Sequence, residues 1–368
     1  MSVGKKRMAK ILFKNGRIWN GEAFVFSDVL IDGNKILKIR PFIEDNAELI
    51  IDAAGKTVSA GLIDIHTHLE NVSDDCFGVS PDTGCIPFGV TSCADASGIH
   101  GDEALLKSMS VNAKVFILLG PDSRDEDFKN TEDAIKKYGS RVAGIKTYLD
   151  SAISDLASTR PLERVIDFAH QKGLPVMVHW ADSKFTMSQL LDILKSGDII
   201  THAYHTGKNT ALSDGFKAIR QAKKRGVVID TGFAGHVNTD FYVLKKAIEN
   251  GAFPDTISSD LTKLSSCKRG GNYGLPMCMS FLRHLGMDED KIFRAVTSRP
   301  AEVLRIDGGF LKEGLTADIC LLEYSDEGFS LTDSSGNTIE NSQGYRCLMT
   351  VAKGEVVYIN KKHAEEKI

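Results

Sequence analysis

The sequence has little excess charge, few cysteines and no long apolar segment. Its 368 residues include 45 lysines and arginines against 49 acidic residues, a formal net charge of −4, which disfavours a nucleic-acid partner. The seven cysteines form no CxxC pairs, so a disulfide framework or a zinc knuckle is not expected. No apolar run is long enough to span a bilayer, and the opening MSVGKKRMAKILFKNG does not resemble a secretory signal. We expect a cytoplasmic protein with free thiols that does not bind membranes.

Short β-type segments with glycine turns occupy both ends of the chain. KILFKNGRIW and SDVLIDGNKILKIR lie near the start, and GLTADICLLEY and YRCLMTVAKGEVVYI lie near the end. Apolar clusters broken by Asn-Gly and Asp-Gly are typical of strands joined by turns. We expect residues 1–58 and 307–368 to build one small β-sandwich together; the alternative is that they only decorate a neighbouring domain.

Between these ends, apolar β-type runs alternate with helix-type stretches. Such alternation predicts parallel strands with right-handed crossovers, and the lack of polar alternation predicts burial on both faces. Eight units over residues 59–306 match a (β/α)₈ TIM barrel of about 250 residues. An open doubly wound sheet is the alternative, but no GxGxxG follows the first run. The eight runs are GLIDIH, GVTSCAD, KVFILLG, RVAGIKTYL, GLPVMVHW, DIITHAY, GVVIDTG and DTISSD.

Polar residues gather where these runs end. In a parallel barrel the carboxyl ends of the strands surround one opening, where active sites form. The spacings between the polar residues each fit a whole number of strand–helix repeats. Each residue alone has an ordinary explanation, such as a buried histidine or an aspartate that caps a helix, but a set at one depth favours a metal site. The set is His66, His68, Lys146, His179, His202 and Asp260.

Imidazole nitrogens and a carboxylate are the ligands that zinc and similar divalent ions take in proteins. Lys146 is unusual in such a set, because an ammonium has no lone pair and repels a dication. Burial among metal ions would lower the pKa of its amine, and a neutral amine can add CO₂. The resulting carbamate is anionic and has two oxygens, so it can bridge two metal ions.

The chain resembles the amidohydrolase superfamily, which includes dihydroorotase, hydantoinase and urease. The resemblance rests on ILFKNGRIWNG, DVLIDGNKILKI, DAAGKTVSAGLIDIHTH, FGVTSCADA, GLTADICLLE and VAKGEVVYI, which span nearly the whole chain. It implies a distorted (β/α)₈ barrel with a small β-sandwich made by both termini, a hydrolase acting on carbon–nitrogen or ester bonds, and a homo-oligomer.

The resemblance also implies two divalent metal ions, with zinc the expected metal. His66, His68 and Asp260 would bind the more buried ion, and Lys146, N-carboxylated by CO₂, would bridge both ions. The more exposed ion would be held by two further imidazoles, those of His179 and His202.

Within the superfamily, GIKTYLD, NGAFPDTISSDLTKLS, GLPMCMSFLRHLGM and VTSRPAEVL resemble bacterial deacetylases. That group implies acetylated amino acids or hydroxy acids as small-molecule substrates. Hydrolysis of a cyclic amide, as in dihydroorotase or hydantoinase, and an aminohydrolase activity, as in adenine deaminase, stay open as alternatives. A non-catalytic barrel is disfavoured, because such proteins lose metal ligands and all six ligand residues are present in this chain.

Further roles are expected around this centre. Asp260 would transfer protons as general acid–base, and Tyr148 would stabilise the oxyanion or serve only as a wall residue. His205, His236 and Arg269 are expected to bind substrate from loops after the later strands, and Arg269 suits a carboxylate. The loop sequence DTGFAGHVN departs from the family pattern by an insertion before His236, which leaves the placement of that histidine open.

Overall fold

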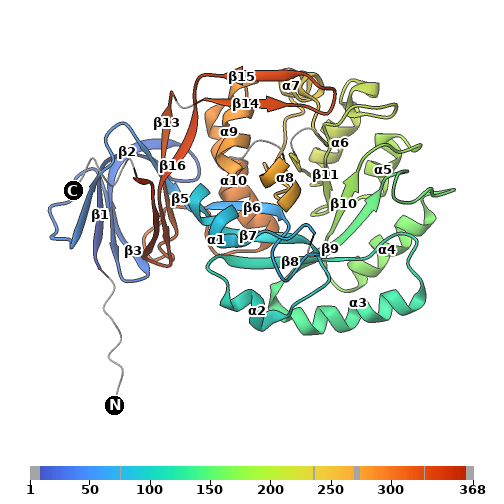
Figure 1. Cartoon of the computed structure of the whole chain (residues 1–368), viewed down its shortest axis with the longest axis horizontal. Coiled ribbons are helices and arrows are strands. Elements are labelled where there is room, and N and C mark those ends of the chain that lie inside the picture. The colour runs from blue at the N-terminus through green and yellow to red at the C-terminus, as the bar shows by residue number, and fades with distance from the viewer. Residues whose placement is uncertain (1–8, 75, 235–236, 269–273, 327, 362–368) are drawn as a thin grey trace, which may run out of the picture.

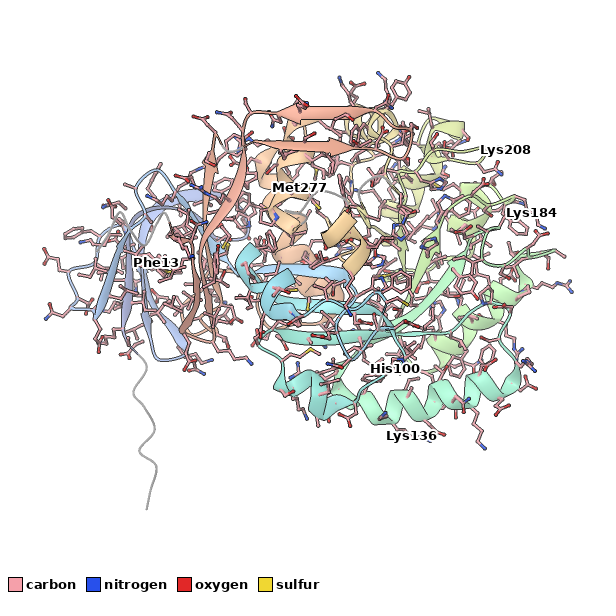
Figure 2. The ribbon with its side chains drawn as sticks, viewed as in Figure 1. Phe13, His100, Lys136, Lys184, Lys208 and Met277 are labelled. Atoms are coloured by element: carbon pink, nitrogen blue, oxygen red, sulfur yellow. The ribbon has the colours of Figure 1, made fainter. Side chains whose placement is uncertain are left out.

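The computed structural model describes residues 9–74, 76–234, 237–268, 274–326 and 328–361 (Figure 1). It has an α/β fold with a mixed sheet at one side, a curled parallel sheet with helices around it, and a small hairpin. Phe13 lies inside the mixed sheet, whereas Lys136 and Lys184 project from the surface (Figure 2).

The mixed sheet is built from both ends of the chain. Its strand order is β17-β16-β13-β5-β1-β2-β3, and β4 pairs with β1. The two ends meet where β5 runs antiparallel to β13, with Val58 opposite Leu321. Strands from both ends of the chain therefore share one sheet, while the terminal β-sandwich stays a prediction. The strands are β1 (Ile11–Trp19), β2 (Phe24–Asp32), β3 (Lys35–Arg40), β4 (Leu49–Asp52), β5 (Thr57–Ala60), β13 (Ile319–Ser325), β16 (Gly344–Ala352) and β17 (Glu355–Ile359).

Seven parallel strands follow one another in chain order across the second sheet. All residues of β6 are buried, which agrees with an apolar run covered on both faces. The strands match the first seven predicted runs, although the last two are much shorter than expected. They are β6 (Leu62–Thr67), β7 (Val90–Gly98), β8 (Asn112–Leu118), β9 (Val142–Leu149), β10 (Val176–Trp180), β11 (Ile199–Thr201) and β12 (Val228–Ile229).

The eighth predicted run, DTISSD, is not a regular strand; it forms isolated bridges to both edges of the sheet. Thr256 pairs with Asp230 just after β12, and Leu261 pairs with Thr67 of β6. Some of its backbone groups bond to side chains instead of to a neighbouring strand: the Ser259 N–H donates to the carboxylate of Asp64 at 3.2 Å. The segment nevertheless lies where an eighth barrel strand would close the sheet.

Helices cover the outer face of the parallel sheet, as α2, α3 and α4 do along its lower side in Figure 1. In α4 the buried residues recur at helical spacing, from Leu162 through Val165 and Ile166 to Ala169. None of the helices in the described part of the chain is long and apolar enough to cross a membrane. The helices are α1 (Pro81–Gly84), α2 (Glu103–Ser108), α3 (Asp125–Tyr138), α4 (Arg160–Gln171), α5 (Met187–Ile193), α6 (Lys217–Lys224), α7 (Phe241–Glu249), α8 (Lys263–Lys268), α9 (Leu275–His284), α10 (Glu289–Val296) and α11 (Ser298–Leu304).

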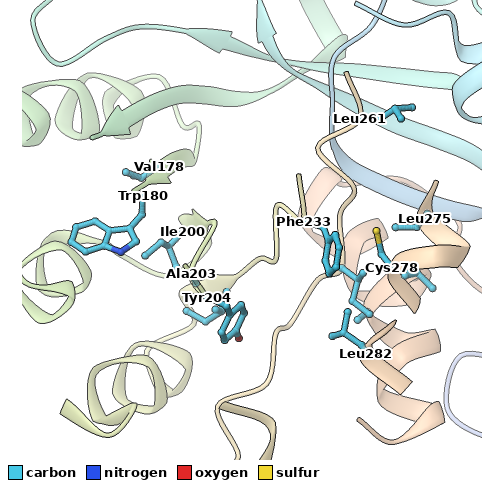
Figure 3. Close-up of a cluster of buried hydrophobic side chains, with 14 of the residues drawn as sticks. Val178, Trp180, Ile200, Ala203, Tyr204, Phe233, Leu261, Leu275, Cys278 and Leu282 are labelled. Carbon is cyan, nitrogen blue, oxygen red and sulfur yellow. The ribbon is translucent and has the colours of Figure 1, made fainter. Parts of the chain in front are cut away.

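Apolar side chains fill the space between strands and helices. Figure 3 shows Trp180 and Tyr204 beside the green helices from the middle of the chain, and Phe233 facing Cys278 and Leu282 of α9. These side chains are almost fully buried. Burial of this kind contributes about 25 cal/mol for each Å² of apolar surface, so it holds the strand ends in place.

A hairpin of β14 (Phe329–Thr332) and β15 (Thr338–Asn341) leaves the terminal sheet and lies beside α7 (Figure 1). The carboxylate of the buried Asp333 accepts the backbone N–H of Phe241 at 3.1 Å. The Ser335 hydroxyl donates to Asp240 at 2.6 Å. Part of residues 307–368 therefore packs against the start of α7, which the terminal β prediction did not anticipate.

Candidate functional site

Three of the predicted ligands form a tight group at the ends of the strands. His66 is in β6, His68 follows it directly, and Asp260 lies in the closing segment. Oδ1 of Asp260 is 3.3 Å from Nε2 of His66 and 3.2 Å from Nε2 of His68. One ligand atom from each residue lies within 4.8 Å of the others. This spacing suits a single metal ion with nitrogen and oxygen ligands.

Lys146, in β9, points its amine into the same group. Its Nζ lies 3.2 Å from Nε2 of His66 and 3.5 Å from Sδ of Met177. The lysine is only 6% exposed. Burial lowers the pKa of its amine to about 8, although Asp260 and Asp230 act in the opposite direction. The lowered pKa increases the share of neutral amine, which is the form that carboxylation requires.

His179 and His202 continue the group as neighbouring rings. The His202 ring centroid lies 5.1 Å from that of His66 and 4.4 Å from that of His179. His179 is in β10, and His202 follows β11 directly. The structure therefore brings together all six predicted strand-end residues. The ring of His202 neighbours both that of His66 and that of His179.

Hydrogen bonds determine which nitrogen of His66 carries the proton. Thr201 Oγ1 donates its single proton to Asp230 at 2.8 Å, so it accepts at 3.0 Å from Nδ1–H of His66. Nε2 of His66 is then the nitrogen with a lone pair, and it faces Asp260 and Lys146. A metal-binding histidine commonly has its other N–H held in this way.

Hydrogen bonds also hold Nδ1 of His68 and of His202. Ser73 donates to Asp95 at 2.6 Å, and the hydroxyls of Ser73 and Ser97 lie 3.0 and 2.9 Å from Nδ1 of His68. Nδ1–H of His202 donates to the carbonyl of Gly232 at 2.7 Å. His66 and His202 thus present unprotonated Nε2 atoms for metal binding.

Electrostatics favour neutral imidazoles and an ionised carboxylate. Burial holds the pKa values of His66 and His202 well below their usual range, and the positive charge of Lys146 acts in the same direction. Burial alone would raise the pKa of Asp260, but the neighbouring histidines His66, His68 and His202 outweigh it and hold that pKa well below its usual range. Neutral nitrogens with one carboxylate are a donor set that fits zinc and related divalent ions.

Two of these residues have backbones in the left-handed region. The φ angle is 62° at His202 and 51° at Asp260. For residues other than glycine this conformation costs about 1–2 kcal/mol, and such strain clusters at functional sites. At Asp260 the conformation is held by the bond from its N–H to the His66 carbonyl, 2.8 Å long.

Supporting residues behind the ligands were not predicted. Asp230, directly after β12, is fully buried and accepts hydrogen bonds from the hydroxyls of Thr201, Thr256 and Ser258. In the sequence, the position of Asp230 directly after GVVI, within a predicted strand run, could have identified it. Asp150 lies 3.3 Å from Nε2 of His179, and the aspartate after the GIKTYL motif gave no indication of that contact.

The other predicted residues are placed less centrally. The Tyr148 hydroxyl donates to Asp122 at 2.7 Å, and burial together with that carboxylate raises the pKa of the phenol. Nδ1–H of His205 donates to the Thr206 carbonyl at 2.6 Å. The two remaining predicted substrate residues, at positions 236 and 269, lie outside the described residues; they are His236 and Arg269.

Comparison with known proteins places these features in context. The model of the amidohydrolase family matches residues 57–357. A deacetylase from Enterococcus faecalis is 28% identical, with 94% of this chain and 98% of the relative covered. A solved dihydroorotase structure, 25% identical, superimposes with a TM-score of 0.83 over 95% of this chain and 98% of its own. A solved adenine deaminase structure, 26% identical, gives a TM-score of 0.82 over 95% of this chain and 99% of its own.

Proposed function

Because this chain belongs to the amidohydrolase family, we propose that it is a deacetylase with two metal ions. Membership of the family makes it a metal-dependent hydrolase of carbon–nitrogen bonds. The observation that carries the proposal is the convergence of three histidine side chains and the Asp260 carboxylate beside the buried amine of Lys146. The substrates would be N-acetyl amino acids or O-acetyl hydroxy acids.

The residues divide between two positions. His66, His68 and Asp260 would hold the more buried ion, and Lys146, as its carbamate, would supply oxygens to both. The more exposed ion would be held by His179 and His202. Zinc is the metal that this donor set favours.

When bound, two such ions polarise a carbonyl and lower the pKa of a bound water from 15.7 to about 7. Asp260 is placed to accept a proton from the attacking water, because its ionised carboxylate faces the ligand nitrogens. The same carboxyl group would then donate the proton to the leaving nitrogen or oxygen. The acyl bond breaks, and acetate and a free amine or alcohol are released.

Tyr148 is proposed to donate a hydrogen bond to the developing oxyanion. In the structure its proton goes to Asp122, so this role requires the hydroxyl to turn towards the substrate. His205, His236 and Arg269 are proposed to bind the rest of a carboxylate-bearing substrate.

A panel of substrates tests the proposal: N-acetyl amino acids, O-acetyl hydroxy acids, dihydroorotate and adenine. We expect the zinc-loaded protein to release acetate from at least one acetylated acid with the highest kcat/KM of the panel. The dihydroorotase and adenine deaminase structures make the last two compounds the natural alternatives. Turnover of either one, with none of the acetylated acids, would refute a deacetylase.

The remaining features are proposals of the same kind. We propose that residues 1–58 and 307–368 form a β-sandwich beside a (β/α)₈ barrel of residues 59–306. The shared terminal sheet and the bridges of Thr256 and Leu261 support this division. A cytoplasmic location and a homo-oligomeric state complete the proposal.

A further inference from the structure

A second cavity lies at the opposite end of the parallel strands from the metal-ligand group. It has a volume of about 330 Å³ and is lined by the beginnings of β6, β7 and β8, the loop after α11 and part of the terminal sheet. Pockets for small ligands begin at about this size. Three basic residues line it: Lys114, Arg305 and the exposed Lys353.

Lys114, in β8, is half-buried, and no residue in the described part of the chain forms a hydrogen bond or ion pair with its ammonium. Burial and the positive charges of Arg141 and Arg305 lower the pKa of Lys114. Arg141 itself is engaged by Asn112 and the carbonyl of Ala113. Lys114 is therefore a partly desolvated cation whose pKa is shifted by positive charges, an arrangement that a bound anion would stabilise.

Arg305 follows α11 with its backbone in the left-handed region, at a φ of 53°. Its guanidinium forms no hydrogen bond or ion pair with any described residue. It also lines an adjacent cavity of about 460 Å³, where the other charged groups are paired: His170 with Asp198 at 3.0 Å and Arg299 with Glu302 at 2.7 Å. Arg305 is thus left free for a partner in the smaller cavity.

Two carboxylates, three hydroxyls and an amide, that of Asn112, complete the polar lining. Asp318 accepts the backbone N–H of Lys353 at 2.7 Å, and Asp307 is exposed at the rim. Among the described residues neither carboxylate is within 4.0 Å of a basic group of the cavity. The hydroxyls, of Thr91, Ser92 and Thr316, are neutral and can donate hydrogen bonds.

We propose that this cavity binds a small oxyanion, a carboxylate or a phosphate group, between Lys114 and Arg305. An arginine offers two parallel N–H donors to such a group, and a lysine contributes a compact positive charge. The bound anion would compensate the partly buried ammonium of Lys114, and the neighbouring hydroxyls would supply further donors. The site is separate from the metal centre and does not rest on the proposed deacetylase activity.

Lysine labelling of the zinc-loaded wild-type protein tests the proposal. Modification by acetic anhydride would be measured by mass spectrometry in inorganic phosphate, in acetate and in chloride at equal ionic strength. At an anion concentration about four times Kd, labelling of Lys114 should fall about fivefold relative to chloride. Lys224, exposed on α6, is the matched control and should be labelled equally throughout.

The outcomes separate the possible sources of the oxyanion. Protection by phosphate alone indicates a phosphate ligand, and protection by acetate alone indicates a carboxylate ligand. The variant Arg305→Gln should lose the protection while keeping its kcat, because Arg305 is remote from the metal centre. Equal labelling of Lys114 in all three salts, or protection that persists in Arg305→Gln, would overturn the two-cation site.

Discussion

Nζ of Lys146 lies 3.2 Å from Nε2 of His66. The amine of a residue in β9 and the lone pair of a residue in β6 thus point at the same place. His66 must accept this bond, because Thr201 already takes its Nδ1–H. A metal ion bound at Nε2 of His66 would take the place of this N–H donor. This fits a lysine that contributes to the site only after its amine has lost its charge.

Replacement of Lys146 by alanine is expected to abolish activity. Wild-type protein should contain close to two divalent ions per chain by elemental analysis, and Lys146→Ala fewer, because the bridging group is lost. Activity should fall at least about 100-fold, as for other losses of metal-site contacts, and a small carboxylic acid with added metal should restore part of it. Lys224→Ala is the control, and unchanged activity in Lys146→Ala would rule out a carbamate.

Asp260→Asn should separate metal binding from proton transfer. An amide can still offer an oxygen ligand but cannot take up a proton, so most of the metal should stay while kcat falls by about 10²–10⁴. Steady-state kinetics and metal content on the same preparation provide the measurement, with Asp307→Asn as control. A change confined to KM would remove the proton-transfer role.

Thr201→Val should weaken metal binding without removing a ligand. Valine has nearly the shape of threonine but offers no acceptor to Nδ1–H of His66 and no donor to Asp230. Loss of such a supporting bond lowers metal affinity by about 10–100-fold, which competition with a chelator would measure. Thr201→Ser keeps the hydroxyl and should stay near wild type; equal affinities of both variants would contradict the role assigned to Thr201.

Glu289→Gln should lower stability in a pH-dependent way. Glu289 accepts bonds from Arg17 on β1, Arg283 on α9 and Tyr345 on β16, at 2.7, 2.8 and 2.8 Å. Burial raises the pKa of this carboxyl, but its three partners outweigh that effect and lower the pKa. The ionised form is therefore stabilised by folding, and we expect a loss of about 1–3 kcal/mol at pH 7.

The sign of the pH effect follows from that lowered pKa. The contribution of Glu289 is fully present above the unfolded pKa of about 4.3 and is lost as pH falls through the folded value. Urea denaturation should show a wild-type advantage at pH 7 that shrinks below about pH 4. Glu302→Gln, in an exposed pair with Arg299, should cost less than about 0.5 kcal/mol; an equal loss in both variants would refute the special role of Glu289.

The alternation of apolar runs and amphipathic stretches was sufficient to predict the parallel strands, because both periodicities are local. The last runs show the limit of this signal. In DTISSD, the backbone N–H of Ser259 bonds to Asp64, a residue 195 positions earlier, so the extended ladder is interrupted. The hairpin of β14 and β15 was not foreseen either, because its position depends on the contact between Asp333 and Phe241.

The six candidate ligands follow from the sequence, since strand ends in parallel sheets converge and their residue types suit metal ions. Only the tertiary structure decided the protonation states of these side chains. The proton of His66 is assigned through Thr201, 135 residues away, and then Asp230, and the low pKa of Lys146 comes from its burial. Protonation depends on partners and solvent exclusion that no local pattern encodes, whereas the identity and order of the candidate ligands can be read from the sequence.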